Sequence, residues 1–144
     1  MIAPNEVLSR FILTRSHLDW SNPDYPRLRP EALMPHPHVE LSVFRTSALS
    51  METVKNLGES VAAERSETDK RQVVLQGCGE IENSHVLAAG LNTIPAEPPP
   101  NHACIIGWPK LSANKKEDKS RQKSIAQRLI SETRFVNLLS NSGD

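Results

Sequence analysis

The chain has 144 residues, the length of one compact domain with little room for a second. A chain of this length buries about two-thirds of its unfolded surface, so it needs neither a disulfide nor a metal to fold. Its 17 basic residues balance its 17 acidic residues, which argues against whole-molecule attraction to nucleic acid or to an anionic membrane. We expect one domain over residues 1–144, with a mixed α/β body at 7–109 and a basic linker and C-terminal helix at 110–144.

The N-terminal residues and the cysteines predict a cytoplasmic protein. No basic stretch followed by an apolar run, typical of a secretory signal, is present at the N-terminus. The longest apolar runs have only a few residues, whereas a membrane span needs about 20. Cys78 and Cys104 are too few for a disulfide framework, although a single disulfide between them stays open. We therefore expect reduced thiols and no membrane partner.

The first half of the chain predicts two strands, a long loop and a helix. Dense apolar residues at 8–14 indicate a buried strand, and alternating residues at 39–44 indicate a half-buried one. Between them a Pro-rich surface loop is expected over residues 19–38, because proline restricts its own backbone and that of the preceding residue. A helix should follow from Met51 to Arg65, with Ser47 or Ser50 as its N-cap. Gly58 inside it indicates either close packing on a sheet or a break.

The second half predicts three short strands and two helices. A strand at 72–76 is expected to end in a tight turn at Gly77-Cys78-Gly79, where the glycines would supply positive φ. A short helix should run from Ser84 to Ala88 and stop at Gly90. An edge strand at 91–94, a buried strand at 102–106 and a helix at 116–139 complete the order. This order predicts an α+β fold with a small mixed or antiparallel sheet of four to five strands, two main helices and the long Pro-rich loop.

Arg10, His17 and Arg45 are the best candidates for catalysis. If the strands at 8–14 and 39–45 pair, these three side chains could approach one another at one end of the sheet. Arginine forks bind phosphate or carboxylate, and histidine transfers protons near pH 7. The alternative is that the arginines make ordinary surface ion pairs. Ser42 lies in no Gly-x-Ser-x-Gly motif, so the sequence does not predict a serine hydrolase.

Histidine and cysteine spacings give only weak support for a metal site, and we expect no resident metal and no other cofactor. His36 and His38 would point the same way in an extended chain, but two ligands do not close a site. A second possible set supplies two cysteines and two histidines at spacings that match no common zinc motif. Its members are Cys78, His85, His102 and Cys104.

Basic residues gather at the start of the C-terminal helix and are candidate binding residues, as is His102. They are Lys115, Lys116, Lys119, Arg121 and Lys123. A row of cations could follow a nucleic-acid backbone, and cations at a helix start oppose the helix dipole unless an anionic partner is present. The region has only Phe135 for base stacking, so nucleic acid is possible but not favoured.

Several stretches together resemble a recurrent family of short bacterial proteins of unknown function. They are residues 10–12, 16–18, 41–45, 90–91, 98–103 and 106–109, and the likeness extends from about residue 8 to 136. The resemblance implies no catalytic residues. It directs attention to Ser16-His17, Phe44-Arg45 and the segment from Pro98 to Ala103.

Three functional hypotheses follow from the sequence. The leading one is a cytoplasmic accessory protein that acts with a partner protein or with further copies of itself, because Pro-rich loops and a charged amphipathic helix are good contact elements. The second is a phosphate- or nucleotide-directed enzyme that uses the Arg/His group. The third is a nucleic-acid-binding accessory module that uses the basic helix.

Overall fold

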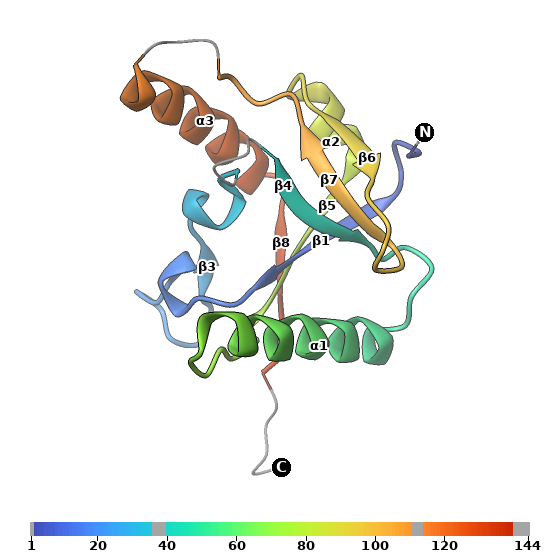
Figure 1. The fold of residues 1–144 in the computed structure, drawn as a ribbon. Helices are drawn as coiled ribbons and strands as arrows, with labels where there is room; N and C mark the ends of the chain where they lie inside the picture. The colour runs from blue at the N-terminus through green and yellow to red at the C-terminus, as the bar shows by residue number, and fades with distance from the viewer. Residues whose placement is uncertain (1, 36–39, 111–113, 140–144) are drawn as a thin grey trace.

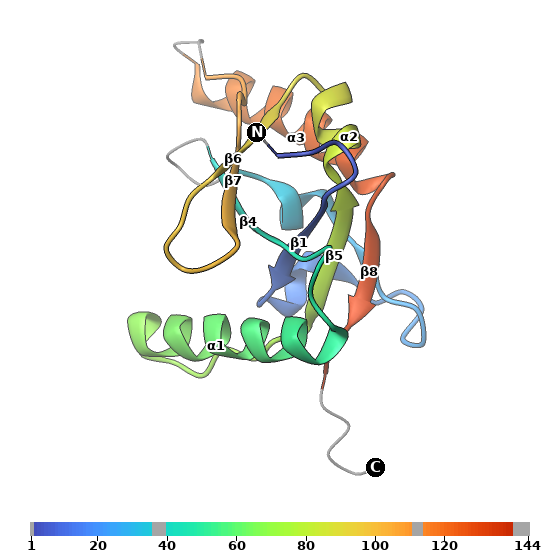
Figure 2. The ribbon, with the colours of Figure 1, turned by 90° about the vertical axis from the view of Figure 1, so that its right-hand side faces the viewer.

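The computed structural model describes residues 2–35, 40–110 and 114–139. Its centre is a six-stranded antiparallel sheet with the strand order β6-β7-β4-β1-β5-β8. The strands are β1 (Val7–Ile12), β4 (Leu41–Arg45), β5 (Gly77–Glu82), β6 (Asn92–Pro95), β7 (His102–Ile106) and β8 (Arg134–Asn137). Figure 1 and Figure 2 show α1 (Met51–Asp69) across one face, with α2 (Asn83–Ala88) and α3 (Lys115–Ile130) on the other. The predicted α+β class is confirmed, with a larger sheet than expected.

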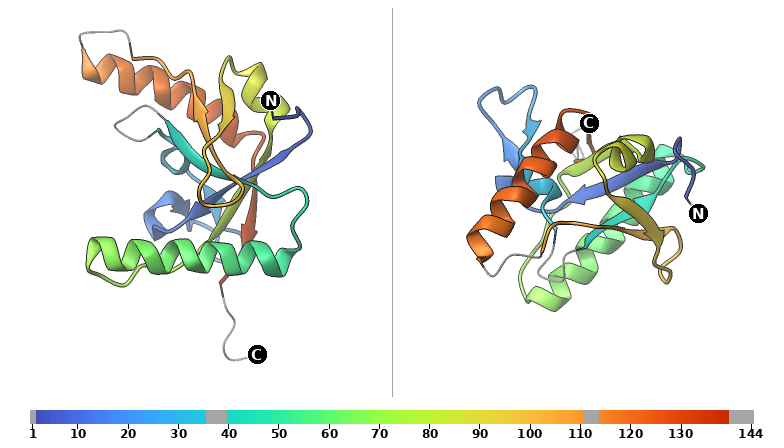
Figure 3. Two further views of the ribbon diagram at one scale, coloured as in Figure 1. Left: turned by 45° about the vertical axis from the view of Figure 1, so that its right-hand side comes forward. Right: turned by 90° about the horizontal axis from the view of Figure 1, so that it is seen from above.

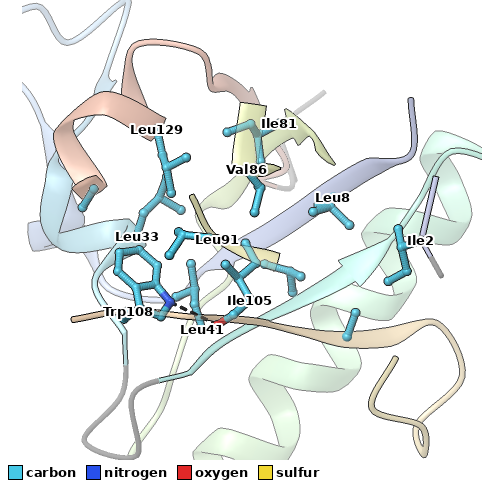
Figure 4. Close-up of a cluster of buried hydrophobic side chains, with 13 residues drawn as sticks. Ile2, Leu8, Leu33, Leu41, Ile81, Val86, Leu91, Ile105, Trp108 and Leu129 are labelled. Atoms are coloured by element: carbon cyan, nitrogen blue, oxygen red, sulfur yellow. Dashed lines mark hydrogen bonds between the residues drawn. The ribbon is translucent and has the colours of Figure 1, made fainter. Parts of the chain in front are cut away.

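Alternation along the strands gives each face of the sheet its own core. The larger core lies under α2 and α3, and Figure 4 shows it. Strand and helix side chains meet there, among them Leu8, Leu41, Ile105, Val86 and Leu129. The second core lies under α1 and contains Phe11, Phe44, Val54, Ala62 and Leu75. None of the described helices has the length and apolar character needed to cross a bilayer.

A buried asparagine ties the N-terminal segment to the body. The Asn83 Nδ2 group donates to the carbonyl oxygens of Ile2 (3.1 Å) and Ala3 (3.3 Å). Its Oδ1 atom accepts a hydrogen bond of 2.7 Å from the hydroxyl of Thr93. Both polar atoms of the Asn83 side-chain amide therefore have hydrogen-bond partners, as expected for a buried polar group.

The segment between β1 and β4 contains more regular structure than a loop. It holds two 3-10 turns, η1 (Arg15–His17) and η2 (Pro30–Leu33), and the short antiparallel pair β2 (Leu18–Asp19) and β3 (Arg27–Leu28). The turn η2 packs against α3, which fixes the segment beside the sheet (Figure 3). The part of the predicted Pro-rich loop at 36–38 lies outside the described residues.

The predicted strand at 72–76 and the turn at 77–79 are wrong. The strand β5 begins at Gly77, and residues 72–76 are not in a ladder. Gly77 and Gly79 are not among the described glycines with positive φ, which are Gly90 and Gly107. A Cβ on Gly77 would collide with the backbone oxygen of Val136 in β8. Gly77 therefore serves close approach of two strands, and not a turn.

The predicted helix at 116–139 is correct only in its first part. The helix α3 ends at Ile130, and β8 then pairs antiparallel with β5. Phe135 and Val136 stabilise a strand better than an exposed helix end, because aromatic and β-branched side chains suit a pleated surface. The ion pair between Arg134 and Glu80 (2.6 Å) joins the same two strands.

Other elements agree with their predictions. Ser50 caps α1 by accepting from the backbone N–H of Thr53 at 3.1 Å, although this helix continues to Asp69. Gly90 has a φ of 85° just after α2, and β6 is an edge strand. Gly58 is explained by close packing, since a Cβ there would lie 2.8 Å from the Phe11 ring and 2.9 Å from Leu75.

We predict that Gly58→Ala destabilises the protein by about 1 to 3 kcal/mol, because overpacking of the Phe11 and Leu75 contacts outweighs the gain in helix propensity. Urea unfolding measures this change. Ser60→Ala, at an exposed position of the same helix, should change the free energy of unfolding by less than about 0.5 kcal/mol. Equal stability of Gly58→Ala and the parent would contradict the close packing of α1 on the sheet.

Candidate anion-binding cleft

The Arg10 side chain fills a gap where two neighbouring strands separate. The strands β1 and β4 pair only at Leu8 with Arg45 and at Ser9 with Phe44, whereas β1 and β5 pair over six positions. Beyond that short ladder, Arg10 donates from Nη1 to the carbonyl oxygen of Ser42 (3.0 Å). Its Nε donates to the carbonyl oxygen of Ala32 in η2 (3.4 Å). The guanidinium thus replaces ladder hydrogen bonds and links β1, β4 and η2.

A cleft of about 140 Å³ opens beside this guanidinium. Such a volume holds a few water molecules, at about 30 Å³ each, or one small anionic group. Two further basic side chains line it: His17 from η1 and Arg65 from α1. Hydroxyl groups of Thr14 and Ser42 and apolar side chains complete the lining.

The two arginines of the cleft have no ion-pair partner within the described residues. No carboxylate of the described residues lies within 4.0 Å of Arg10 or Arg65. Burial and, to a smaller extent, the positive charge of Arg65 together lower the pKa of Arg10 to about 10. Burial also lowers the pKa of His17, and the charge of Arg10 adds to this, against an opposing effect of Glu31. Burial and the repulsion between cations both disfavour additional positive charge, and a bound anion would act in the opposite direction.

Of the predicted catalytic group, the structure brings together Arg10 and His17 but not Arg45. The strands at 8–14 and 39–45 do pair as expected. Arg45 is the last residue of β4 and lies opposite the beginning of β1. There it forms an ion pair of 3.1 Å with Glu6. Hydrogen bonding to Ser47 and Arg45 lowers the pKa of Glu6 despite its partial burial. Arg45 is therefore in a structural pair outside the cleft, and Arg65 takes the place expected for it.

A serine and a histidine form a hydrogen-bonded pair on the α1 face of the sheet, beside the cleft. The Ser42 Oγ and His102 Nε2 atoms are 2.5 Å apart, and His102 Nδ1 is 2.9 Å from the carbonyl oxygen of Ala96. Because a carbonyl only accepts, Nδ1 carries a proton, and in the neutral imidazole Nε2 then accepts from the serine hydroxyl. The Phe44 ring packs beside the imidazole, with centroids 5.2 Å apart. A shallow depression lined by Ser42, His102, Arg65 and the acidic Glu64, among others, adjoins the first cleft.

The cysteine and histidine set is not gathered into one site. His102 and Cys104 lie on the α1 face of the sheet, whereas His85 is in α2 on the other face. Within the described residues no group of three potential metal ligands is found. Both cysteines are free thiols. Burial raises the pKa of Cys78 to about 12 and also raises that of Cys104, so both thiols are protonated near neutral pH. His36 and His38 lie outside the described residues.

The basic residues of α3 are all exposed and fall into two groups. Lys115, Lys116, Lys119 and Lys123 share one side of the helix at 3.6 residues per turn. Arg121 lies on another side and pairs with Glu117 at 2.6 Å. Asn114 caps the helix by accepting from the backbone N–H of Lys116 and Glu117. None of the four lysines lines the cleft.

Comparison with known proteins gives no relative: no family model, curated protein or solved structure matches the chain.

Arg65 and the pairing of Ser42 with His102 could not be singled out from the sequence. Arg65 is one of several charged residues near the end of α1, and only the crossing of α1 over the sheet brings it to Arg10. Ser42 and His102 are 60 residues apart and come close because β4 pairs with β7. The one feature of the sequence that could have indicated Ser42 and His102 is their position in strands of mostly apolar residues. A polar side chain that faces a helix from such a strand needs a hydrogen-bond partner.

We predict that the free energy of unfolding falls as the pH decreases through about 6.5, with a contribution from His17. The folded state lowers the pKa of His17 below the value in the unfolded chain, so the unfolded state binds more protons in this range. Urea unfolding between pH 5 and 8, in a buffer without multivalent anions, measures the slope. His17→Gln should give a shallower slope, and an identical slope in both proteins would contradict the burial of a neutral imidazole.

Proposed function

We propose that the protein binds a small ligand through an oxyanion group, a phosphate or a carboxylate, in the cleft of Arg10, His17 and Arg65. The observation that carries this proposal is the Arg10 guanidinium, which is partly buried and has no carboxylate partner among the described residues. A partly buried charge with no opposite charge beside it is costly, and a ligand that supplies the opposite charge would offset this cost.

The chemistry of the cleft suits an oxyanion better than a halide. Guanidinium groups present planar forks of N–H donors that match two oxygens of a phosphate or carboxylate. Arg10 uses Nε and Nη1 for the carbonyl oxygens of Ala32 and Ser42, which orients the guanidinium and leaves other N–H groups for a ligand. Arg65 enters from α1, and the neutral His17 can become a further donor by taking up a proton.

The proposal predicts that inorganic phosphate raises the melting temperature more than sodium chloride at the same ionic strength. Stabilisation follows from binding to the folded state, about 1.4 kcal/mol at ten times the dissociation constant. Binding should be tighter at pH 6 than at pH 8 when sulfate replaces phosphate, because sulfate does not titrate there while His17 gains a proton. Thermal unfolding monitored by circular dichroism gives both comparisons.

Arg65→Gln is the decisive variant, since Arg65 is exposed and its replacement leaves both cores intact. Without ligand it should melt at a temperature equal to or above the parent, because a repulsion with Arg10 is removed. Its affinity for phosphate should fall by about tenfold or more, the value of one charge-assisted hydrogen bond. Arg71→Gln, an exposed arginine outside the cleft, is the matched control. Equal stabilisation of parent and Arg65→Gln by phosphate would contradict the proposal.

A second proposal retains the leading sequence hypothesis, a cytoplasmic accessory protein, and makes the partner another copy of this chain. Tyr25 is 73% exposed and lines a groove of about 540 Å³ together with Leu28, Ile130 and Phe135. The groove adjoins β8, which is an edge strand of the sheet. Unpaired strand edges are common sites of strand addition.

If two copies associate at this edge, Tyr25→Asp should shift the protein toward the monomer. Sedimentation velocity at protein concentrations of roughly 10 to 200 µM covers the range of weak dimers. Val74→Asp is the matched control, because Val74 is 46% exposed and lies outside the groove. A parent protein that stays monomeric across this range would contradict self-association.

A further inference from the structure

The Ser42 and His102 side chains have the arrangement of a nucleophile and its general base. A serine hydroxyl becomes a useful nucleophile when a neighbouring base removes its proton, and the base must be oriented by a third group. His102 meets both conditions: its Nε2 faces Ser42 Oγ at 2.5 Å, and its Nδ1 faces the carbonyl oxygen of Ala96 at 2.9 Å. The carbonyl selects the tautomer in which Nε2 is free to accept.

The surrounding chain holds this histidine in place. The backbone N–H of Ala96 donates to the carbonyl oxygen of His102 at 2.8 Å, and the N–H of His102 donates to that of Pro99 at 3.1 Å. The segment between β6 and β7 is therefore folded back on the imidazole, while Phe44 packs against its ring. Such support is what a reacting pair requires, since small displacements of catalytic groups reduce rates strongly.

Both residues are accessible and lie beside the proposed anion site. Ser42 and His102 are partly exposed. Ser42 lines the cleft with Arg10 and His17, and with His102 and Arg65 it also lines the adjoining depression. A substrate held by its oxyanion group between the arginines would extend along the α1 face toward Ser42.

We propose that Ser42 and His102 hydrolyse a carboxylic ester that carries a second, negatively charged group, an inference that rests on the proposed function for the substrate's charge. Ser42 Oγ attacks the carbonyl carbon and His102 Nε2 takes the hydroxyl proton. The intermediate then collapses: the ester C–O bond breaks, and His102 returns the proton to the leaving alkoxide. Water next loses a proton to Nε2 and attacks the acyl-serine. Release of the acid restores the proton to Ser42 Oγ.

The first test is covalent labelling with a fluorophosphonate, which forms an O–P bond to an activated serine with loss of fluoride. Tandem mass spectrometry of the parent protein should locate the label on Ser42. Ser42→Ala should abolish labelling, and His102→Gln should slow it by at least about 100-fold, as loss of a general base does. Ser60→Ala and His85→Gln are matched controls with unchanged labelling, and circular dichroism checks that all variants fold.

The second test compares two nitrophenyl esters, the neutral butyrate and the negatively charged hydrogen glutarate. The kcat/KM for the glutarate should be about tenfold higher than that for the butyrate. Arg65→Gln should reduce this ratio of the two kcat/KM values. An unlabelled parent protein, or a label on another serine, overturns the hydrolytic pair even where phosphate stabilises the protein. If Ser42 is labelled but the two esters have equal kcat/KM values, the proposal of a negatively charged substrate is wrong, whereas the proposal that Ser42 and His102 hydrolyse esters is supported.

Discussion

The placement of one cation, the Arg10 guanidinium, determines the arrangement of the candidate site. The strands β1 and β4 pair at only two positions and then separate, and Arg10 bridges the gap with hydrogen bonds to Ser42 and to Ala32 of η2. The segment between the two strands is thereby attached to the sheet, and His17 is carried to the cleft. A neutral side chain could not donate to two carbonyl groups in this way and also attract an anion.

The two faces of the sheet differ in the kind of residues that they carry. The core under α2 and α3 is the larger one and also buries the hydrogen-bonded Asn83 and Thr93. The polar pair Ser42 and His102 lies on the α1 face beside the smaller core. The helix α1 approaches the sheet closely at Gly58 and, about two turns later, carries Arg65 to the cleft. The packing of one helix on the sheet thus supplies one of the charged groups of the cleft, which would connect the stability of this layer to the proposed binding of an anion.

The sequence predicted the elements whose signals are local. The Ser50 cap, the apolar spacing of α1 and the stop at Gly90 depend on neighbouring residues, and these predictions are confirmed. The prediction of a helix to residue 139 was wrong because Phe135 and Val136 are set by pairing with β5, a contact over more than 50 residues. The prediction of a turn at Gly77 was wrong for a similar reason. Glycine is required there because β8 passes too close for a side chain, and this contact is distant in the sequence. In the candidate cleft, Arg10 and His17 are residues that the sequence singled out, whereas the positions of Arg65 and Ser42 and the ion pair of Arg45 with Glu6 depend on long-range packing.

The central claim, that the cleft holds an uncompensated positive charge that an anion neutralises, is tested most directly by anomalous diffraction. Crystals of the protein would be soaked in tungstate, an oxyanion that scatters strongly and that guanidinium groups bind as they bind phosphate. We expect an anomalous peak within hydrogen-bond distance of both Arg10 and Arg65, and its loss in Arg65→Gln. Peaks confined to the lysine side of α3, with none between Arg10 and Arg65, would contradict the account.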